Sequence, residues 1–173
     1  MFRNLVLLAL LSFASVSLAL GQSSSEMRSV SCSFQDGTGM VVRYSSANAD
    51  DQEVPYGSIW NPGGTPFVLM TETPLQIGNT HLPIGGYRIY LRPDRTDWSL
   101  IVNDGVTVNG YDSSRDLARI GMQSGELSKH KSKFKVSIVR TNPSTCSLTV
   151  YHGKRGYWAD FTKTDKAATA LEK

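Results

Sequence analysis

The residues that could carry out chemistry in this sequence are three histidines and several aspartates near expected turns. His81, His130 and His152 lie far apart and lack partners at the short spacings typical of metal ligands. Two aspartates could act as a glycosidase pair only if folding brought them within about 5 to 9 Å, and otherwise they cap turns or offset arginines. The candidates are Asp94, Asp97, Asp104, Asp112 and Asp116. Without a nucleophile, phosphate-loop or zinc motif, we predict no catalytic residue, metal or cofactor.

Aromatic residues could form a surface on which sugar rings stack. Alternation along the expected strands buries Tyr87 and Trp98, so most of the aromatic residues belong to the core. The candidates for binding are therefore Tyr56, Trp60 and Trp158.

Basic residues are concentrated in the run Lys129-His-Lys-Ser-Lys-Phe-Lys135 and in Lys154-Arg155. Such a patch could bind an anionic envelope surface or an acidic polysaccharide. The lysines could equally protect the edge of a strand against aggregation. The net charge of +3 does not indicate a nucleic-acid partner.

The N-terminus has the pattern of a secretory signal peptide. Arg3 precedes an apolar run that starts at Leu5, and small residues follow at Ala19 and Gly21. The apolar stretch of about 16 residues is shorter than the roughly 20 that a transmembrane helix needs. We therefore predict a signal peptide over 1–21 with cleavage after Gly21 or Ala19, no transmembrane anchor, and a periplasmic or secreted protein.

Cys32 and Cys146 are the only two cysteines. Export to an oxidising compartment would allow them to form a disulfide, which would tie an early strand to a late one. Two separately buried thiols are the alternative, because spacing alone does not establish proximity.

The chain after the signal peptide has the pattern of an all-β protein. Strict alternation over Phe134–Ile138 is typical of a half-buried strand. In another run, Tyr87, Ile89 and Leu91 face one way and Arg88, Tyr90 and Arg92 the other. The other expected strands are Ser29–Phe34, Met40–Tyr44, Phe67–Thr71, Leu75–Ile77, Trp98–Val102, Leu117–Met122, Cys146–Tyr151 and Trp158–Phe161. About ten short strands separated by turn residues, with one turn expected at Gly153, predict a single antiparallel β-sandwich or barrel-like domain.

The domain is expected over residues 29–162, with a flexible N-terminus over 22–28 and a polar tail over 163–173. The stretch from Ser45 to Pro66 lacks alternation and is long for a loop. Its second half, Val54–Pro66, places aromatic and apolar residues between Pro and Gly, which predicts an ordered loop.

The segment Val54-Pro-Tyr-Gly-Ser-Ile-Trp60 resembles the Val-Pro-Tyr-Gly-x-x-Trp signature of one bacterial family, the "domain of unknown function 2911" family. Further similar segments are Leu75–Tyr90, Pro93, Trp98–Asn103 and Asp116-Leu-Ala-Arg119, so the resemblance covers roughly residues 54–122. It implies an exported, mostly β domain in an envelope-bearing bacterium and supplies no activity.

Two segments depart from the family pattern. Members usually continue after the Trp with Arg-Thr-Gly-Ala-Asn, where this chain has Asn61-Pro-Gly-Gly-Thr65. The expected Gly-x-Trp-Gly segment is replaced by Val106-Thr-Val-Asn-Gly110. A ligand site in the first loop would therefore be lost or altered in this protein.

The resemblance also selects Asp116 and Arg119 as candidate binding residues. An arginine beside an aspartate could bind a carboxylate or sugar hydroxyls. The pair could instead hold a loop against the sheet, since paired charges are more often structural.

Two functional hypotheses follow. The first is an exported, non-catalytic β domain that binds a glycan or another envelope component or has a structural role. The alternative is a small envelope hydrolase in which Asp116, Arg119, His81 or His152 converge from loops.

Overall fold

The computed structural model describes residues 27–46, 53–104 and 110–165, with the backbone alone for 130–133. The predicted signal peptide, most of the expected N-terminal segment and residues 166–173 of the tail lie outside these ranges. No helix in the described residues is long and apolar enough to cross a membrane.

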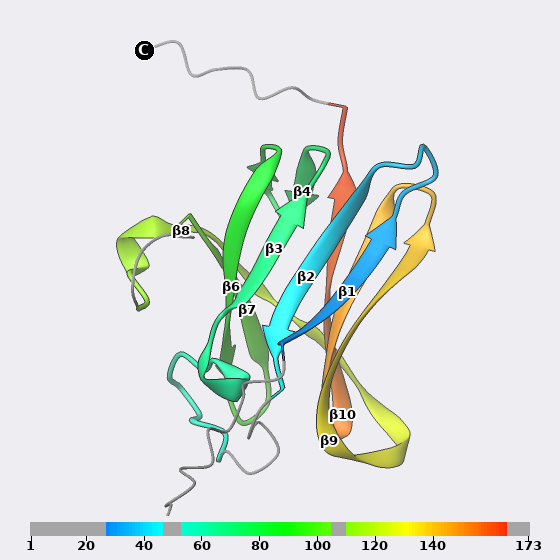
Figure 1. Cartoon of the computed structure of the whole chain (residues 1–173). Coiled ribbons are helices and arrows are strands. Elements are labelled where there is room, and N and C mark those ends of the chain that lie inside the picture. Colours follow the sequence, from blue (N-terminus) through cyan, green and yellow to red (C-terminus); the bar gives the residue numbers. More distant parts are fainter. Residues whose placement is uncertain (1–26, 47–52, 105–109, 166–173) are drawn as a thin grey trace, which may run out of the picture.

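Two antiparallel sheets pack face to face, which confirms the predicted all-β fold (Figure 1). The six-stranded sheet has the order β1 (Met27–Ser33), β2 (Gly39–Ser45), β3 (Phe67–Thr71), β6 (Gly85–Pro93), β7 (Trp98–Asn103) and β8 (Asp116–Gly121). The four-stranded sheet has the order β5 (Thr80–Leu82), β4 (Leu75–Ile77), β10 (Thr145–Lys163) and β9 (Gln123–Asn142). Two short 3-10 turns complete the described elements, η1 (Pro62–Gly64) and η2 (Ser113–Arg115).

The core fills the space between the sheets because alternate residues of each strand are apolar. Met40, Val42 and Tyr44 of β2 are all buried there, whereas Val41 and Arg43 between them are exposed. Tyr87 and Trp98 are buried as predicted.

The last two strands are longer than the sequence indicated. Phe134–Ile138 is the middle of β9, and the two segments expected around Leu148 and Trp158 are parts of the single strand β10. Gly153, expected to mark a turn, lies inside β10 with a φ of 59° where the register shifts. Glycine takes up this left-handed conformation without steric cost, so the strand resumes its pairing after the irregularity.

The ordered half of the long loop is attached to the sheet through Trp60. Its N–H donates to the Leu91 carbonyl at 2.7 Å, and the Leu91 N–H donates back at 3.2 Å. Gly63, within η1, has a φ of 78°, and a Cβ at this position would lie 2.6 Å from the Ser45 carbonyl oxygen. The close approach requires glycine here, so the loop packs against the end of β2.

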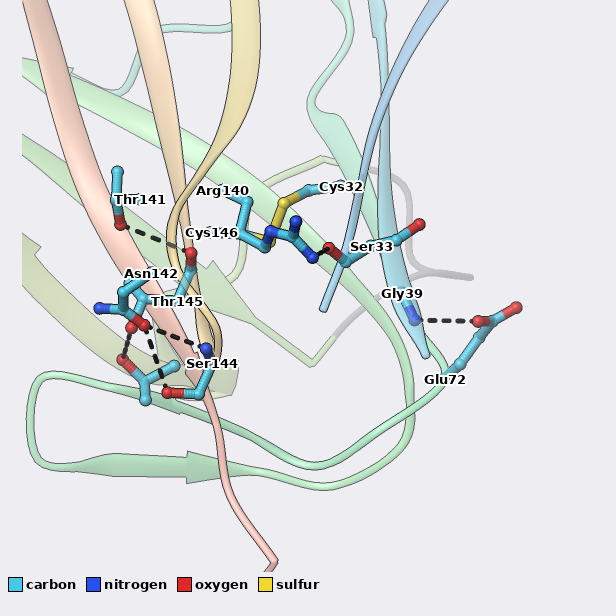
Figure 2. The surroundings of a disulfide bond; sticks show 11 residues. Cys32, Ser33, Gly39, Glu72, Arg140, Thr141, Asn142, Ser144, Thr145 and Cys146 are labelled. Atoms are coloured by element: carbon cyan, nitrogen blue, oxygen red, sulfur yellow. Dashed lines mark hydrogen bonds between the residues drawn. A yellow bond between two sulfur atoms is a disulfide. The ribbon is translucent and has the colours of Figure 1, made fainter. Parts of the chain in front are cut away.

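A disulfide joins the two sheets at one edge of the sandwich. Cys32 of β1 and Cys146 of β10 are bonded, as predicted. Beside them the Arg140 guanidinium donates to the Ser33 carbonyl at 3.4 Å (Figure 2). This hydrogen bond is a second link between the sheets, from β9 to β1. A third link is the ion pair between Lys163 Nζ and Asp36 Oδ2 at 2.6 Å.

Candidate functional site

A patch of the six-stranded sheet is covered on the face that points away from the core. Tyr90 and Ile101 lie on this outer face, yet they are 1% and 0% exposed. Gly110 and Tyr111 cover Tyr90: the Tyr90 hydroxyl donates to the Gly110 carbonyl at 3.0 Å. The ring of Tyr111 meets that of Tyr90 edge-on, with centroids 4.9 Å apart. The sequence placed Tyr90 on the outer face correctly and missed its cover, because contacts with a loop leave no periodic pattern.

Asn103, at the end of β7, attaches this cover to the neighbouring strand. The side chain is 2% exposed, and its Nδ2 donates to the Asp112 carbonyl at 2.8 Å. The same nitrogen donates to Asp116 Oδ1 at 2.9 Å. One buried amide therefore holds both the loop and the first residue of β8, as a buried polar group requires.

Asp116 and Arg119 lie on the same face of β8 because the strand contains a bulge. Residues three apart in a regular strand point to opposite faces. Here Asp116 pairs with Asn103 and Ala118 with Val102, so Leu117 is an extra residue in the ladder. The bulge brings the carboxylate and the guanidinium to one side of the sheet.

The second carboxylate oxygen of Asp116 completes a three-residue cluster, which we call the outer-face site: Tyr111, Asp116 and Arg119. Oδ2 accepts a hydrogen bond from the Tyr111 hydroxyl at 2.6 Å and another from Arg119 Nη2 at 3.2 Å. Nη2 also lies 3.2 Å from the tyrosine oxygen. The Asp116 side chain is 16% exposed and that of Arg119 is 45% exposed. The site thus has the negatively charged Asp116 carboxylate at its bottom and the positively charged Arg119 guanidinium at its rim.

Tyr111 is held in its protonated form. Burial and the hydrogen bond to Asp116 raise the pKa of its phenol to about 12. Desolvation and a neighbouring anion both disfavour a phenolate. At neutral pH the hydroxyl is therefore a hydrogen-bond donor and not a base.

Asp112, next to the site, forms a turn. Its Oδ1 accepts hydrogen bonds from the Ser114 N–H at 2.9 Å and the Ser114 hydroxyl at 2.7 Å. These bonds to Ser114 lower the carboxyl pKa. Asp94 similarly accepts from the Arg95 N–H at 2.8 Å. Both aspartates shape turns, the role typical of aspartate there.

The aromatic candidates lie on other elements. Tyr56 is 55% exposed in the loop that precedes Trp60, and Trp158 is half-buried on β10. Trp60 is only 4% exposed, and its ring packs edge-on against those of Trp98 and Phe134. Its position in the core means that truncating Trp60 would test stability and not the binding of a ligand at the surface.

His81 and His152 are likewise placed against different elements, and the side chain of His130 lies outside the described residues. His81 Nδ1 lies 3.5 Å from the Thr164 hydroxyl, next to the end of β10. The ring of His152 packs against those of Trp60 and Trp98, with centroids 5.8 and 6.0 Å away. Within the described ranges no three His, Cys, Asp or Glu side chains are grouped so as to hold a metal ion.

The residues that sequence reasoning missed are Tyr111 and Asn103. Tyr111 lies just before the selected motif, and Asn103 ends an apolar strand, which is a weak signal for a buried amide.

The model of the family described as "Protein of unknown function (DUF2911)" matches residues 25–157. The chain belongs to the DUF2911 family. This confirms the resemblance found in the sequence, and for a DUF2911 protein the function has to be argued from the site itself. The curated proteins and the solved structures compared with the chain gave no match.

Proposed function

We propose that this DUF2911 protein is an exported, non-catalytic domain of the bacterial envelope that binds a glycan at the outer-face site. The observation that supports this most directly is the way Asp116 and Tyr111 fix Arg119. The guanidinium is about half exposed, and one nitrogen is held by two oxygens at 3.2 Å. Its orientation is therefore set before a ligand arrives, which lowers the entropic cost of binding.

Arg119 retains the donors that a ligand needs. The hydrogen bonds to Asp116 and Tyr111 use Nη2, and within the described part of the chain Nε and Nη1 make no hydrogen bond or ion pair. A guanidinium keeps its N–H groups in one plane, so Nε and Nη1 can each donate to a separate sugar hydroxyl or carboxylate oxygen.

Binding suits this cluster better than acid–base catalysis. A general base must accept a proton from the substrate, with an oxygen in hydrogen-bond reach of it. Asp116 uses Oδ1 for Asn103 and Oδ2 for both Tyr111 and Arg119. The raised pKa of Tyr111 keeps its phenol protonated at neutral pH. The alternative of a hydrolase would also need His81 or His152, which contact other parts of the fold.

Export is supported by two independent features. The disulfide between Cys32 and Cys146 is typical of proteins that fold in an oxidising compartment. The N-terminal residues have the charge and apolar pattern of a signal peptide.

A glycan array tests the proposal, with protein purified from cells that express the full chain. We expect retention of one glycan class and a loss of about tenfold or more in affinity for Arg119→Ala, because a charge-assisted hydrogen bond is removed. Arg95→Ala is the matched control, since Arg95 is an exposed arginine in the β6–β7 turn. Equal binding by both variants, or release of reducing sugar ends that Asp116→Asn abolishes, would contradict the proposal.

A further inference from the structure

One straight row of side chains crosses the outer face of the six-stranded sheet and ends at the outer-face site. Arg43 on β2 pairs with Val68 on β3, and Val68 pairs with Arg88 on β6. Arg88 pairs with Asn103 on β7, and Asn103 pairs with Asp116 on β8. Because directly paired residues share a face, all five side chains project to the same side.

The row is cationic at regular intervals. Arg43 and Arg88 are two strands apart, and Arg119 is two strands beyond Arg88 and one pleat further along. Neighbouring strands are about 4.8 Å apart, so successive arginines are separated by roughly 10 Å across the sheet. Asp116 is the carboxylate of the row, and it is already bound by Arg119.

The arginines at the two ends are the more exposed ones. Arg43 is exposed, and in the part of the chain that the structure describes it has no ion-pair partner. Arg88 is half-buried, and its Nη1 lies 3.4 Å from the Gly110 carbonyl oxygen. Arg119 is 45% exposed at the far end. A ligand that reached both ends would need an extended shape and several negative charges.

We propose that the glycan bound here is acidic, a chain that passes over Gly110 and Tyr111, which cover the middle of this face, and whose sugar carboxylates bind Arg119, Arg88 and Arg43. The inference rests on the proposed function and assigns the ligand class. The charge-assisted hydrogen bonds that guanidinium groups donate to carboxylates are stronger than those they donate to neutral hydroxyls.

The surface beside the arginines favours a sugar chain over other anionic polymers. The half-buried Val68 separates Arg43 from Arg88, and the exposed Val41 and Met70 lie alongside. Aliphatic side chains of this kind pack against the C–H faces of sugar rings. Single-stranded nucleic acid stacks its bases on exposed aromatic rings, whereas the aromatic ring between the arginines, that of Tyr90, is 1% exposed.

Calorimetry with a matched pair of probes tests the inference: a short oligogalacturonate, and the same oligosaccharide with its carboxyls reduced to alcohols. We expect the acidic form to bind at least about tenfold more tightly, with an advantage that shrinks as salt rises from about 0.1 to about 1 M. Arg43→Gln should weaken the acidic probe by about fivefold and leave the reduced probe unchanged. Arg95→Gln, which changes the net charge equally, should leave both unchanged. Purified Arg43→Gln protein is checked for an unaltered melting temperature.

The outcomes separate this inference from the proposed function. If the reduced probe binds as tightly as the acidic one and Arg119→Ala weakens both, the glycan site stands and its acidic specificity is wrong. If polyphosphate binds as tightly as the oligogalacturonate, charge alone is recognised and the carboxylate assignment is wrong. If neither oligosaccharide binds and no glycan on the array retains the protein, both proposals are wrong.

Discussion

Breaking the disulfide between Cys32 and Cys146 should cost much of the stability of the fold. The bond spans 114 residues of sequence and joins strands of different sheets. In the chain-entropy model a closed loop of about 100 residues contributes about 4.7 kcal/mol by restricting the unfolded chain. Native disulfides typically contribute about 2 to 5 kcal/mol, so we expect reduction to lower the free energy of unfolding by about 4 kcal/mol.

Urea unfolding of the oxidised and reduced wild-type protein measures this effect. With a slope of about 2 kcal/mol per molar urea, a loss of about 4 kcal/mol lowers the midpoint by about 2 M. The slope itself should rise, because a chain released from the crosslink exposes more surface when it unfolds. Reduction keeps both sulfur atoms in the protein, so the comparison is free of the cavity that a substitution leaves.

Cys32→Ala/Cys146→Ala serves as the control for the reductant. Its midpoint should lie at or below that of the reduced wild type, because the variant also lacks two buried sulfur atoms, and it should not respond to added thiol. Thiol titration must show both cysteines free in the reduced sample. An unchanged midpoint in that sample would refute the reasoning, since it would mean that the crosslink does not limit the unfolded chain.

Two further predictions concern pH. Asp36 has a pKa lowered to about 2, chiefly by its hydrogen bond to Lys163. Because this pKa is lower in the folded protein than in the unfolded chain, the ionised carboxylate stabilises the fold above about pH 4. This stabilisation is lost as the pH falls toward 2. Asp36→Asn should therefore lose less melting temperature than the wild type between pH 5 and pH 2, whereas parallel curves would contradict the assignment. Tyr111, with a pKa raised to about 12, stabilises the folded state below about pH 10 and ceases to do so as the pH rises through 12. Burial also raises the pKa of Tyr87 and Tyr157, so ultraviolet titration should detect several late phenolates. Tyr111→Phe should remove one of them, and Asp116→Asn should shift one to lower pH. An unchanged late amplitude in Tyr111→Phe would contradict the assignment to Tyr111.

The fold followed from the sequence because its determinant is local. Period-two alternation within one strand is set by side chains a few residues apart, so Tyr87, Ile89 and Leu91 could be assigned to the core face directly. The prediction of a turn at Gly153 was wrong for a related reason. A glycine with positive φ is equally suited to a turn and to a bulge within a strand, and only the pairing of β10 with β9 on both sides decides between them.

The site was only partly predictable because a bulge creates it. The spacing of Asp116 and Arg119 in a regular strand would have put them on opposite faces of the sheet. What reverses this is the register between β7 and β8, which depends on partners from two strands. Trp60 shows the same limitation: composition predicted an ordered loop, whereas its burial depends on a bridge to the distant Leu91.

The two edges of the six-stranded sheet explain how a row of separate side chains can act as one binding surface. At one edge β1 is joined covalently to β10 through Cys32 and Cys146. At the other edge β8 continues through Met122 into β9, so the chain itself joins the two sheets. The strands that carry Arg43 and Arg88 therefore lie between two fixed edges, and the strand that carries Arg119 is one of those edges, so the three arginines keep their spacing. A ligand that spans them meets groups whose relative positions are already set, and its binding energy is not spent on ordering the sheet.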